Sequence, residues 1–450
     1  MYISLSEYSP SRDGVKLNTD IFNQAIFDLN KKGGGVLYIE AGKYLVGNVC
    51  LEDNVYLYLD PGAEIIASSN YNDFKNAKSS VMAEQSFLGF IFAKNKNNIG
   101  ILGKGLINGN APFYHSTNVD ELGYRMPNRS RIRTIIFESC ENILLEDFTI
   151  KDAPMWTVHC ISCRIGNINN IKIINDFRFT NTDAIDIDGC SNFNIQGCYI
   201  KTADDGICLK TSEKSKEIDT PCENILVSNC IIESHSSALK IGTESYNNFN
   251  NIKFNNCIIS NSNRGISLVT RDGGCINNVT ISDMSITTKF TLDCHWGKAD
   301  PIFISVKKRD PNNIHCGQIN NVTFNNINII SEGAINIHSE PNDKASKIFF
   351  NNINQCQVVS ENKNRGTYDI RPPCNPNQYD NNGMNNAYYI PLGESRPWGV
   401  FEYPNGIPAI FINGISKDSI SINNCYFSRE NVQKWSDKTI QFYKDGEEIL

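Results

Sequence analysis

Short runs in which apolar and polar residues alternate recur along most of the chain. Each run is followed by a polar pair containing Asn or Asp and then by a second run rich in β-branched residues, and these phrases begin at Glu141, Asn169, Ser191, Glu223, Asn250, Asn277, Asn320 and Asp418. A period of two predicts β-strands. Through the middle of the chain the phrases follow one another about every 22 to 32 residues, a spacing that is typical of solenoids.

The repeated phrases predict the fold class. Two or three short strands cannot bury a core alone, so neighbouring coils must stack. Asn suits the bends, because it tolerates the left-handed backbone conformation and can pair with its copy one coil away. Period-3.6 stripes and regular blades of about 40 residues are absent, which argues against helical repeats and a propeller. We therefore predict an all-β, single-stranded, right-handed parallel β-helix.

The two ends of the predicted solenoid need covers, because terminal coils expose unpaired strand edges. The segment TDIFNQAIFDLNKKGGG predicts a short N-terminal capping helix, with Thr19 as N-cap and Ile21, Ala25, Ile26 and Leu29 on its apolar face. We expect one domain over residues 1–450, divided into 1–65 as cap and entry strands, 66–362 as main coils, and 363–450 as a long loop followed by a C-terminal coil. The irregular stretch 363–408 is expected to fold as a loop over one face.

Charge and hydropathy exclude two classes of partner. The 450 residues carry 42 Lys and Arg against 49 Asp and Glu, a formal charge of −7, which does not suit binding to a phosphate backbone. We therefore expect no nucleic-acid partner. No stretch approaches the roughly 18 apolar residues of a membrane span, and the chain start shows no basic-then-apolar export signal, so we expect no membrane association.

The chain contains 16 cysteines, spread from Cys50 to Cys425. The one close pair, Cys160 and Cys163, lacks a second pair at zinc-site spacing. Many of the others follow equivalent apolar runs, which favours small buried hydrophobic side chains over disulfides or metal ligands. Many reduced cysteines and no visible signal suggest a cytoplasmic protein, unless a signal has been removed.

Carboxylates without countercharge are concentrated in NTDAIDIDGC and KTADDGICLK. Asp183 and the pair Asp204 and Asp205 are separated by 21 residues, close to one coil. Residues one coil apart stack at about 4.8 Å, so these three side chains should meet on one face. In a cluster of carboxylates the pKa of at least one group is raised by the charges of the others. One carboxyl group is then protonated near neutral pH and can act as an acid, while another is ionised and can act as a base.

Two alternatives apply to these carboxylates. Asp186 and Asp188, which alternate with Ile, are interpreted as turn residues. The trio is unlike turn residues, because stacking unpaired charges is costly, but it could also hold a hard cation such as calcium. The predicted catalytic set is therefore Asp183, Asp204 and Asp205.

The paired motifs NTDAIDID and ADDGICLK resemble the signatures of glycoside hydrolase family 28, the polygalacturonase-like pectinases. The N-terminal segment with GGG and the segment DAPMWTVHC are also similar to that family. The resemblance implies inverting hydrolysis without a cofactor. It makes Asp204 the general acid and Asp183 with Asp205 the base pair, and it places Asn181 and Lys210 in the substrate site.

The chain departs from the family pattern twice. The family's Gly-His-Gly aligns with Ser236-Ser237-Ala238, so Ser237 stands at the histidine position, and His235 lies two residues earlier as a possible substitute or a bend residue. The family's Arg-Ile-Lys aligns with Ser267-Leu268-Val269, which removes the basic pair that grips a uronate carboxylate.

Nearby residues could replace the missing contacts. The candidate cations are Lys240, Arg264 and Arg271, with solvated surface roles as the alternative. The candidate aromatic platforms are Trp156 with His159 and Trp296 beside His295, with core packing as the alternative.

These residues predict a glycoside hydrolase that cleaves pectic poly- or oligosaccharides of the galacturonide or rhamnogalacturonan type. One alternative is a uronate lyase or epimerase, which would abstract a C5 proton with help from a cation. The other is a non-catalytic β-helix that binds glycans, since the family histidine is missing. Oligomeric state and endo or exo action are not predicted.

Overall fold

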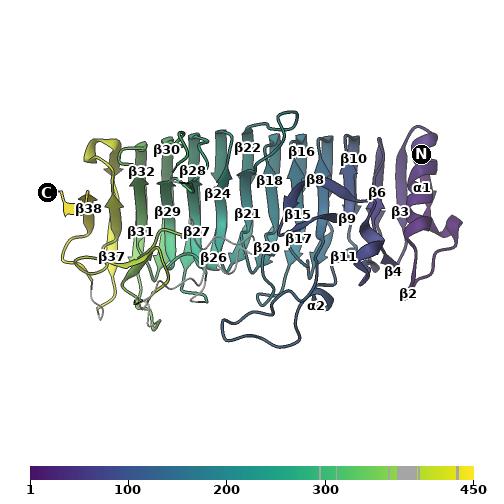
Figure 1. The fold of residues 1–450 in the computed structure, drawn as a ribbon, viewed down its shortest axis with the longest axis horizontal. Helices are drawn as coiled ribbons and strands as arrows, with labels where there is room; N and C mark the ends of the chain where they lie inside the picture. Colours follow the sequence, from purple (N-terminus) through teal and green to yellow (C-terminus); the bar gives the residue numbers. More distant parts are fainter. Residues whose placement is uncertain are drawn as a thin grey trace. The chain divides into compact units, whose positions relative to one another are not determined.

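The computed structural model describes residues 1–292, 295–310, 312–362, 365–371, 393, 396–431 and 435–449. The chain divides into two compact units. Unit 1 comprises Met1–Ala203 with Lys214–Thr220, and unit 2 comprises Asp204–Glu213 with Pro221–Leu450. Each unit is a stack of parallel β-coils, shown in Figure 1, which confirms the predicted right-handed parallel β-helix.

Unit 1 contains three rows of strands, each strand pairing in parallel with its copy in the next coil. The first row is β1(Tyr2–Ser4), β3(Gly35–Ile39), β6(Val55–Leu59), β10(Asn97–Gly103), β13(Glu141–Glu146), β16(Arg164–Asn169) and β19(Ser191–Gln196). The second row is β2(Asp13–Leu17), β4(Gly42–Val46), β7(Ala63–Ala67), β11(Leu106–Asn108), β14(Thr149–Lys151), β17(Lys172–Ile174) and β20(Tyr199–Thr202). The third row is β5(Val49–Cys50), β9(Ser86–Lys94), β12(Arg133–Glu138), β15(Val158–Ile161) and β18(Ile185–Asp188).

One strand of unit 1 breaks the parallel rule. β8(Lys78–Ala83) pairs antiparallel with β9 and forms a hairpin with it. The unit also contains the helices α1(Thr19–Lys31) and α2(Ala111–Tyr114) and the 3-10 turns Leu5–Tyr8 and Tyr71–Phe74.

Unit 2 repeats the arrangement with longer strands. Its first rows are β22(Cys222–Ser228), β23(Ile231–Ser234), β25(Phe249–Asn255), β26(Ile258–Ser262), β28(Ile276–Thr288), β30(Ile319–Ser331), β32(Ala345–Gln357), β36(Ile420–Asn423) and β37(Tyr426–Arg429). Its other row is β21(Ile207–Thr211), β24(Ser237–Ser245), β27(Arg264–Thr270), β29(Asp300–Lys307), β31(Ile335–Glu340), β35(Ile410–Asn413) and β38(Ile440–Lys444). Two short antiparallel pairs, β33(Thr367–Asp369) with β34(Val400–Glu402) and β38 with β39(Glu447–Glu448), and the 3-10 turn Lys417–Ser419 complete the described part.

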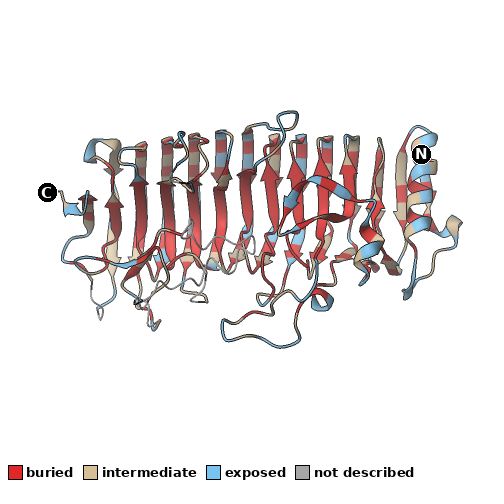
Figure 2. Ribbon diagram, in the orientation of Figure 1, coloured by how far each residue is buried: buried red, intermediate tan, exposed pale blue. Residues whose placement is uncertain are grey.

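Figure 2 shows that most strands carry buried residues, and the register of these strands places core residues of successive coils next to one another. In unit 1 the register aligns Ile101, Leu145, Ile168 and Ile195, all buried. In unit 2 it aligns Ile252, Val279, Val322 and Ile348. In strands such as β6 and β13 alternation buries every second side chain, which is why the period-two pattern was informative, whereas β12, β15 and β18 are buried on both faces.

Asparagine ladders form the bends, as predicted. Asn54, Asn98 and Asn142 all have positive φ, and their side-chain amides are joined by bonds of 2.8 and 3.1 Å. In unit 2 the Asn251 amide donates to Asn224 Oδ1 (3.2 Å) and Asn278 donates to Asn251 Oδ1 (3.4 Å). The left-handed bend and the ladder bond therefore select the same residue type.

The cysteines also behave as the repeat pattern predicts. All fourteen cysteines in the described part of the chain are free thiols, and nine of them are buried. Backbone N–H groups of Cys140 and Cys163 donate to the sulfurs of Cys163 and Cys190, one coil further along, at 3.4 and 3.3 Å. These side chains therefore belong to the packed interior of the coils.

Three details of the predicted elements need correction. Helix α1 begins at Thr19 with Asn18 as N-cap, and Thr19 Oγ1 instead accepts a bond from the Gly47 N–H (2.7 Å). Phe22, and not Ile21, completes the buried face of α1. The phrase beginning at Asn169 starts one strand late, because the register aligns Glu141 and Ser191 with Arg164, while Asn169 pairs with Gln196 at the end of β19. Residues 363–364, 372–392 and 394–395 of the predicted long loop lie outside the described residues.

Candidate active site

In unit 1, Asp183 lies in the segment just before β18. Its carbonyl accepts a bond from the Thr157 N–H (2.8 Å), which ties the segment to the preceding coil. The buried Asn175 amide donates to the Thr182 carbonyl (3.3 Å) and to Thr157 Oγ1 (3.0 Å). The Asp183 side chain is therefore held at a fixed backbone position, and it is 3% exposed.

Asn181 precedes Asp183 and has a left-handed φ of 55°. Its Oδ1 accepts a bond from Arg131 (3.0 Å), and the same guanidinium donates to the Thr180 carbonyl (3.0 Å). Arg131 also lies 4.0 Å from Glu84. Sequence reasoning did not select Arg131 or Glu84, because they are distant in sequence from the Asp motifs.

In unit 2, Asp204 and Asp205 lie just before β21. The Asp205 N–H donates to Asp204 Oδ1 (2.9 Å), and the Asp204 carbonyl accepts from Ser234 Oγ (2.7 Å). The buried Asp205 carboxylate accepts bonds from Ser236 Oγ (2.9 Å) and the Ser237 N–H (3.3 Å). Lys240 Nζ lies 2.6 Å from Asp205 Oδ2.

The charges around Asp205 set its protonation. Burial by itself would raise its pKa, but the ammonium groups of Lys240 and Lys210 and the bonds from Lys240 and Ser236 hold the pKa below its ordinary value. Burial would lower the pKa of Lys240, yet the Asp205 carboxylate raises it above the ordinary value. Asp205 is therefore an ionised carboxylate in a charged pair.

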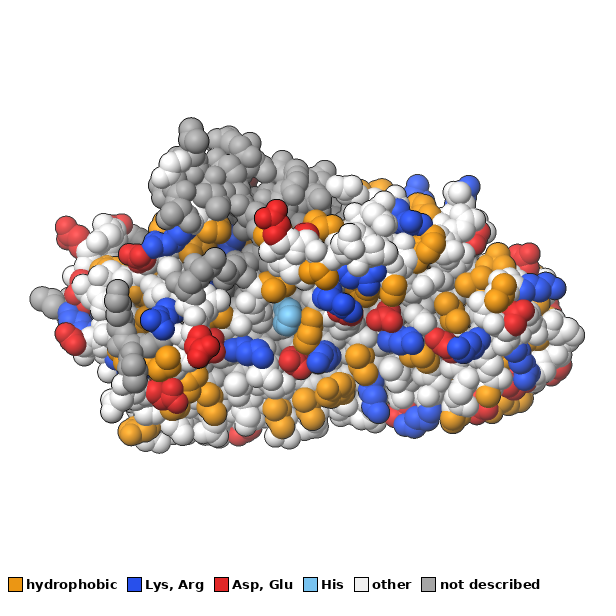
Figure 3. All heavy atoms as spheres, turned by 90° about the horizontal axis from the view of Figure 1, so that it is seen from below, with side chains coloured by type: hydrophobic (Ala, Val, Ile, Leu, Met, Phe, Trp, Pro, Cys, Tyr) orange, Lys and Arg blue, Asp and Glu red, His pale blue; other side chains and the backbone are white. Residues whose placement is uncertain are grey.

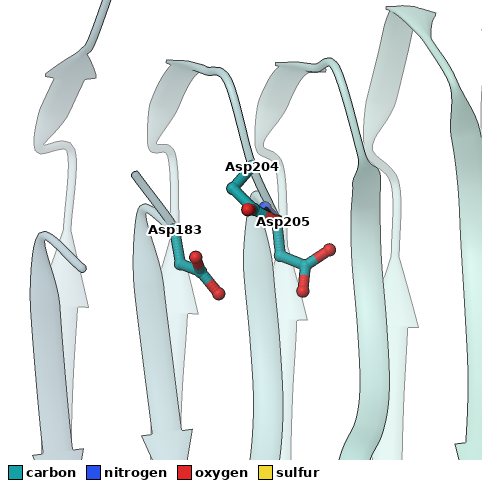
Figure 4. Close-up of side chains that lie close together, drawn as sticks. All are labelled: Asp183, Asp204 and Asp205. Atoms are coloured by element: carbon teal, nitrogen blue, oxygen red, sulfur yellow. Dashed lines mark hydrogen bonds between the residues drawn. The ribbon is translucent and has the colours of Figure 1, made fainter. Parts of the chain in front are cut away.

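The three predicted catalytic carboxyl groups gather together. One carboxylate oxygen from each of Asp183, Asp204 and Asp205 lies within 4.8 Å of the others, and Figure 4 shows the three side chains. Such a group can share a proton or hold a cation. The Lys240 ammonium already occupies Asp205 Oδ2, which reduces the charge left for a cation.

Lys210 and Glu244 form a second charged pair in unit 2. Lys210 Nζ lies 3.5 Å from Glu244 Oε2. Burial raises the pKa of Glu244, but Lys210, Arg309 and Lys240 lower it to about 2. Sequence reasoning selected Lys210 and missed Glu244, which no motif marked.

The serine at the family's histidine position lies beside Asp205. Ser237 Oγ is hydrogen bonded to Ser267 Oγ (2.9 Å), and Ser267 is a residue of the family's Arg-Ile-Lys position. His235 lies nearby, with its ring centroid 6.2 Å from that of His295 and its carbonyl accepting from Thr291 (3.0 Å). The positions at which the family has His and Arg are therefore occupied here by two serines that are hydrogen bonded to each other.

Arg264 is held by other residues of unit 2. It is 2% exposed and donates to Asp300 (3.0 Å) and to the carbonyls of Asp369 (2.7 Å) and Arg371 (3.2 Å). Its guanidinium also lies 3.6 Å from the centre of the Phe303 ring. The alternative of a solvated surface residue is wrong, because the side chain is buried among these partners, and the role as a substrate cation stays a prediction.

Arg271 is also internal. It is 1% exposed and donates to Ser305 Oγ (3.0 Å) and to the carbonyls of Ser305 (3.1 Å) and Ile370 (3.2 Å). The two arginines together hold the segment 369–371, where Asp369 in turn accepts from the Gly297 N–H (2.8 Å).

The aromatic candidates have different surroundings. Trp156 packs against Ala83 and Met155 and keeps 8% exposure. His159 is fully buried, with Nδ1 2.8 Å from Arg133 and Nε2 3.2 Å from Asp188, so its predicted sugar contact is corrected to an internal polar role. Trp296 is half-buried, and its carbonyl accepts from Asn263 (3.1 Å).

Asp186 and Asp188 are not turn residues, contrary to the sequence interpretation. Both lie on β18 and are fully buried. Asp188 forms an ion pair with the buried Lys214 and bonds to His159. Although burial raises the pKa of Asp188, Lys214 and His159 lower it well below its ordinary value.

No helix in the described ranges is both long and apolar enough to cross a membrane. Acidic and basic side chains are mixed on the face drawn in Figure 3. The absence of a nucleic-acid partner stays a prediction from the net charge.

The fold and the carboxylate group define a class, the parallel β-helix proteins related to pectinases. Residues 72–365 match the family described as Glycosyl hydrolases family 28, and the chain belongs to that family. It is 27% identical over 256 residues to a protein named probable polygalacturonase from Vitis vinifera, covering 54% of this chain and 51% of that one. This chain therefore spans about half the length of that relative.

Two solved structures share the fold. An exopolygalacturonase from Thermotoga maritima has a TM-score of 0.68 at 21% identity, covering 79% of this chain and 87% of that one. A family 28 exopolygalacturonase from Yersinia enterocolitica has a TM-score of 0.63 at 16% identity, covering 100% of this chain and 79% of that one. At these identities the likeness concerns the fold, and the activity must be argued from the site.

Proposed function

We propose that this protein is a glycoside hydrolase that cleaves glycosidic bonds of pectic poly- or oligosaccharides. The observation that carries the proposal is the group of three carboxylates, Asp183, Asp204 and Asp205. One oxygen from each carboxylate lies within 4.8 Å of the others. Membership of family 28 and the polygalacturonase name of the Vitis relative support it.

Each carboxyl group has a proposed role. Asp204, next to two other carboxyl groups, carries the proton that is transferred to the departing glycosidic oxygen. Asp183 and Asp205 accept a proton from the water that attacks the anomeric carbon. The C–O bond to the leaving sugar breaks, a new C–O bond to the water oxygen forms, and two hydroxyl-terminated sugars result. The lowered pKa of Asp205 supports its role as a base.

Inversion at the anomeric carbon follows from the family resemblance. Inverting enzymes usually separate their carboxyl groups by about 6.5 to 9.5 Å, and retaining enzymes by about 5 to 5.5 Å. The 4.8 Å given above is an upper bound on the distances between one chosen oxygen of each carboxylate, so it is not the separation of the carboxyl groups used in this rule. The anomer of the first product, observed by NMR during hydrolysis, tests the proposal. A retained anomer would mean that one carboxylate acts as a nucleophile and does not activate water.

The proposed substrate is a uronide of the galacturonide or rhamnogalacturonan type. Lys210 and Lys240 lie beside the carboxylates, and Ser237 and Ser267 offer hydroxyl groups. Both lysines are already paired with Glu244 and Asp205, and the family's Arg-Ile-Lys is absent. This site is therefore less cationic than that of the family pattern, which gives rhamnogalacturonan fragments weight beside plain galacturonides.

The central experiment compares Asp204→Asn with Asp418→Asn, a change of the same chemistry at an exposed position. Activity is measured as new reducing ends on a panel of pectic substrates. Loss of general-acid catalysis should lower kcat about 10²- to 10⁴-fold in Asp204→Asn, while Asp418→Asn keeps wild-type activity. Full activity in Asp204→Asn would refute the assigned roles.

The same carboxylates favour one rival, a cation-assisted uronate lyase. That reaction leaves an unsaturated, ultraviolet-absorbing product and stops when a chelator removes the cation. Hydrolysis should continue in chelator and produce no such absorbance. A chelator-sensitive, absorbing product would establish the lyase instead.

We further propose a reducing compartment, the cytoplasm, as the working location. The free thiols of the fourteen described cysteines support it. Fractionation of cells that express the natural gene tests it, and recovery outside the cytoplasm would contradict it.

A further inference from the structure

One face of the third row of unit 1 leads toward Asp183, and it is covered over β12, β15 and β18. The register aligns Ile136 with His159 and Glu138 with Ile161, and it continues to Asp186 and Asp188 on β18. Because alternate residues of a strand share a face, these six side chains lie on the same side of the sheet. All six are 0% exposed.

The β8–β9 hairpin is the first cover. Ala77 and Val81 pack against Phe92, Ile136 and Ile161. Beyond this cluster, Ser79 Oγ and the Ser80 N–H donate to the buried Glu138 carboxylate at 2.8 and 2.9 Å. The hairpin is thus fixed to the sheet by both apolar packing and charge-assisted hydrogen bonds.

The segment Lys214–Thr220 is the second cover. Its Lys214 forms an ion pair with Asp188, and both side chains are fully buried. Its Ile218 packs against the same apolar cluster as Val81, and its carbonyl accepts a bond from Ser162. The β8–β9 hairpin and the segment Lys214–Thr220 therefore cover this face together.

The cover reaches the coil next to Asp183. The bond from the Thr157 N–H to the Asp183 carbonyl places Trp156 in the coil adjacent to Asp183. Trp156 keeps 8% exposure and packs on Ala83, the last residue of β8. Arg133, one coil further, is 0% exposed and donates to the Val81 carbonyl (2.7 Å).

The tip of the hairpin is also connected to the Asp183 segment. Arg131 lies 4.0 Å from Glu84 at the tip and donates to the Asn181 side chain (3.0 Å). The covered surface extends into the coil of Asp183 itself, because Asp186 and Asp188 on β18 are 0% exposed. The third row of unit 1 therefore offers no continuous open surface for a polymer on that side of Asp183.

We propose that the site accepts the end of a glycan chain and removes terminal units, with the β8–β9 hairpin and Lys214–Thr220 as the stop and Trp156 as the contact for the terminal sugar. This exo mode rests on the proposed function, glycan hydrolysis at Asp183, Asp204 and Asp205. An endo-acting enzyme needs surface on both sides of its carboxylates, and here one side is closed.

The first test is the product pattern of the wild-type enzyme on a long polygalacturonate or rhamnogalacturonan. We expect products one or two sugars long from the earliest time, with little fall in viscosity. A rapid fall in viscosity with products of mixed length would overturn the exo mode while leaving the proposed hydrolysis intact.

The second test measures binding, so that it does not depend on catalysis. Asp204→Asn is titrated by calorimetry with a pectic oligosaccharide and with polymer fractions of different length. Stoichiometry should follow the number of chain ends. Chain-end binding by this variant, together with no hydrolysis by the wild-type enzyme, would keep the chain-end site and refute the proposed function. Stoichiometry that follows chain length, or no binding to any uronide, would refute the inference.

A variant pair tests the hairpin itself. Replacing residues 80–86 with Asn-Gly, a sequence that favours a two-residue turn, should expose Trp156 and Arg133 and lengthen the first products. The control is Gln85→Gly at the exposed tip, where φ is 64°, and it should keep the wild-type pattern. A shortened variant that folds, with an unchanged melting temperature, and still releases only terminal units would overturn the role of the hairpin as the stop.

Discussion

At the scale of single residues, charged side chains near the candidate site are held in pairs. Lys240 pairs with Asp205, Lys210 with Glu244, and Lys214 with Asp188. A buried pair adds little net stability relative to apolar packing, but the removal of one partner leaves a costly uncompensated charge. Each pair therefore fixes the protonation of a carboxylate.

Lys240→Met tests the pair around Asp205. It should lower the free energy of unfolding by about 3 to 5 kcal/mol, because Asp205 would stay buried without its partner. Chemical denaturation measures the change. Lys253→Met, at an exposed lysine of unit 2, is the control and should change stability by no more than about 0.5 kcal/mol.

The same variant changes the pH dependence. The folded pKa of Asp205 is lowered, so its contribution to stability is present above the unfolded value of about 3.9 and is lost as the pH falls through the folded value. In Lys240→Met the pKa of Asp205 rises, and the acid limb of kcat/KM should move to higher pH. An unmoved acid limb would show that Lys240 does not set this ionisation.

Arg264→Lys separates a clamp from a substrate contact. Lysine cannot reproduce the bonds to Asp300 and to two carbonyls, so stability should fall by about 1.5 to 3 kcal/mol. The KM values for a free uronide and for its neutral methyl ester should change by the same factor. Arg164→Lys, at an exposed pair with Glu141, is the stability control. A rise in KM confined to the free uronide would restore the substrate role.

At the scale of elements, the ladders explain why the repeated phrases specify coils. Asn positions such as Asn251 and Asn256 take the left-handed bends of a coil, and each side-chain amide donates to its copy in the preceding coil. The strand between two bends then needs only alternating apolar residues. This is why a single sequence predicted the repeats but placed the phrase at Asn169 one strand late: that coil has Ile165, not Asn, at a left-handed bend.

Two substitutions at Asn251 separate the bend from the ladder. Asn251→Gly can adopt the left-handed φ of 56° without strain but removes the two ladder bonds. Asn251→Ala removes the same two bonds and also strains the left-handed bend. The alanine variant should therefore be about 1 to 2 kcal/mol less stable than the glycine variant, as measured by urea unfolding. Equal stability of the two would show that the bend imposes no strain.

At the scale of the whole molecule, cysteine content and fold class agree. A chain of this length with 16 cysteines could have been a disulfide framework, but the described thiols are free, and most are buried in coils. The organisation as a single domain stays a prediction, since the contacts divide the chain into two compact units.

Thiol titration tests this picture. Protein denatured without reductant should react with a thiol reagent at no fewer than fourteen sites, while the folded protein should react at few, because buried thiols are inert. Mass spectrometry after alkylation identifies each site. Fewer than fourteen reactive thiols after denaturation would reveal disulfides in the natural protein.

The sequence by itself determined the coil period, the β-helix, the thiol interior and the grouping of Asp183, Asp204 and Asp205. These depend on local alternation and on spacings of one coil, which a single sequence displays. The tertiary structure decided which other charges face the site. The surface alternative for Arg264 and Arg271, the sugar contact of His159 and the turn position of Asp188 were wrong, because these side chains are buried against partners on other coils or on added segments such as Lys214–Thr220. A charge on a strand has the same sequence signature whether it meets a substrate or a buried partner, and only the packing of distant segments distinguishes the two.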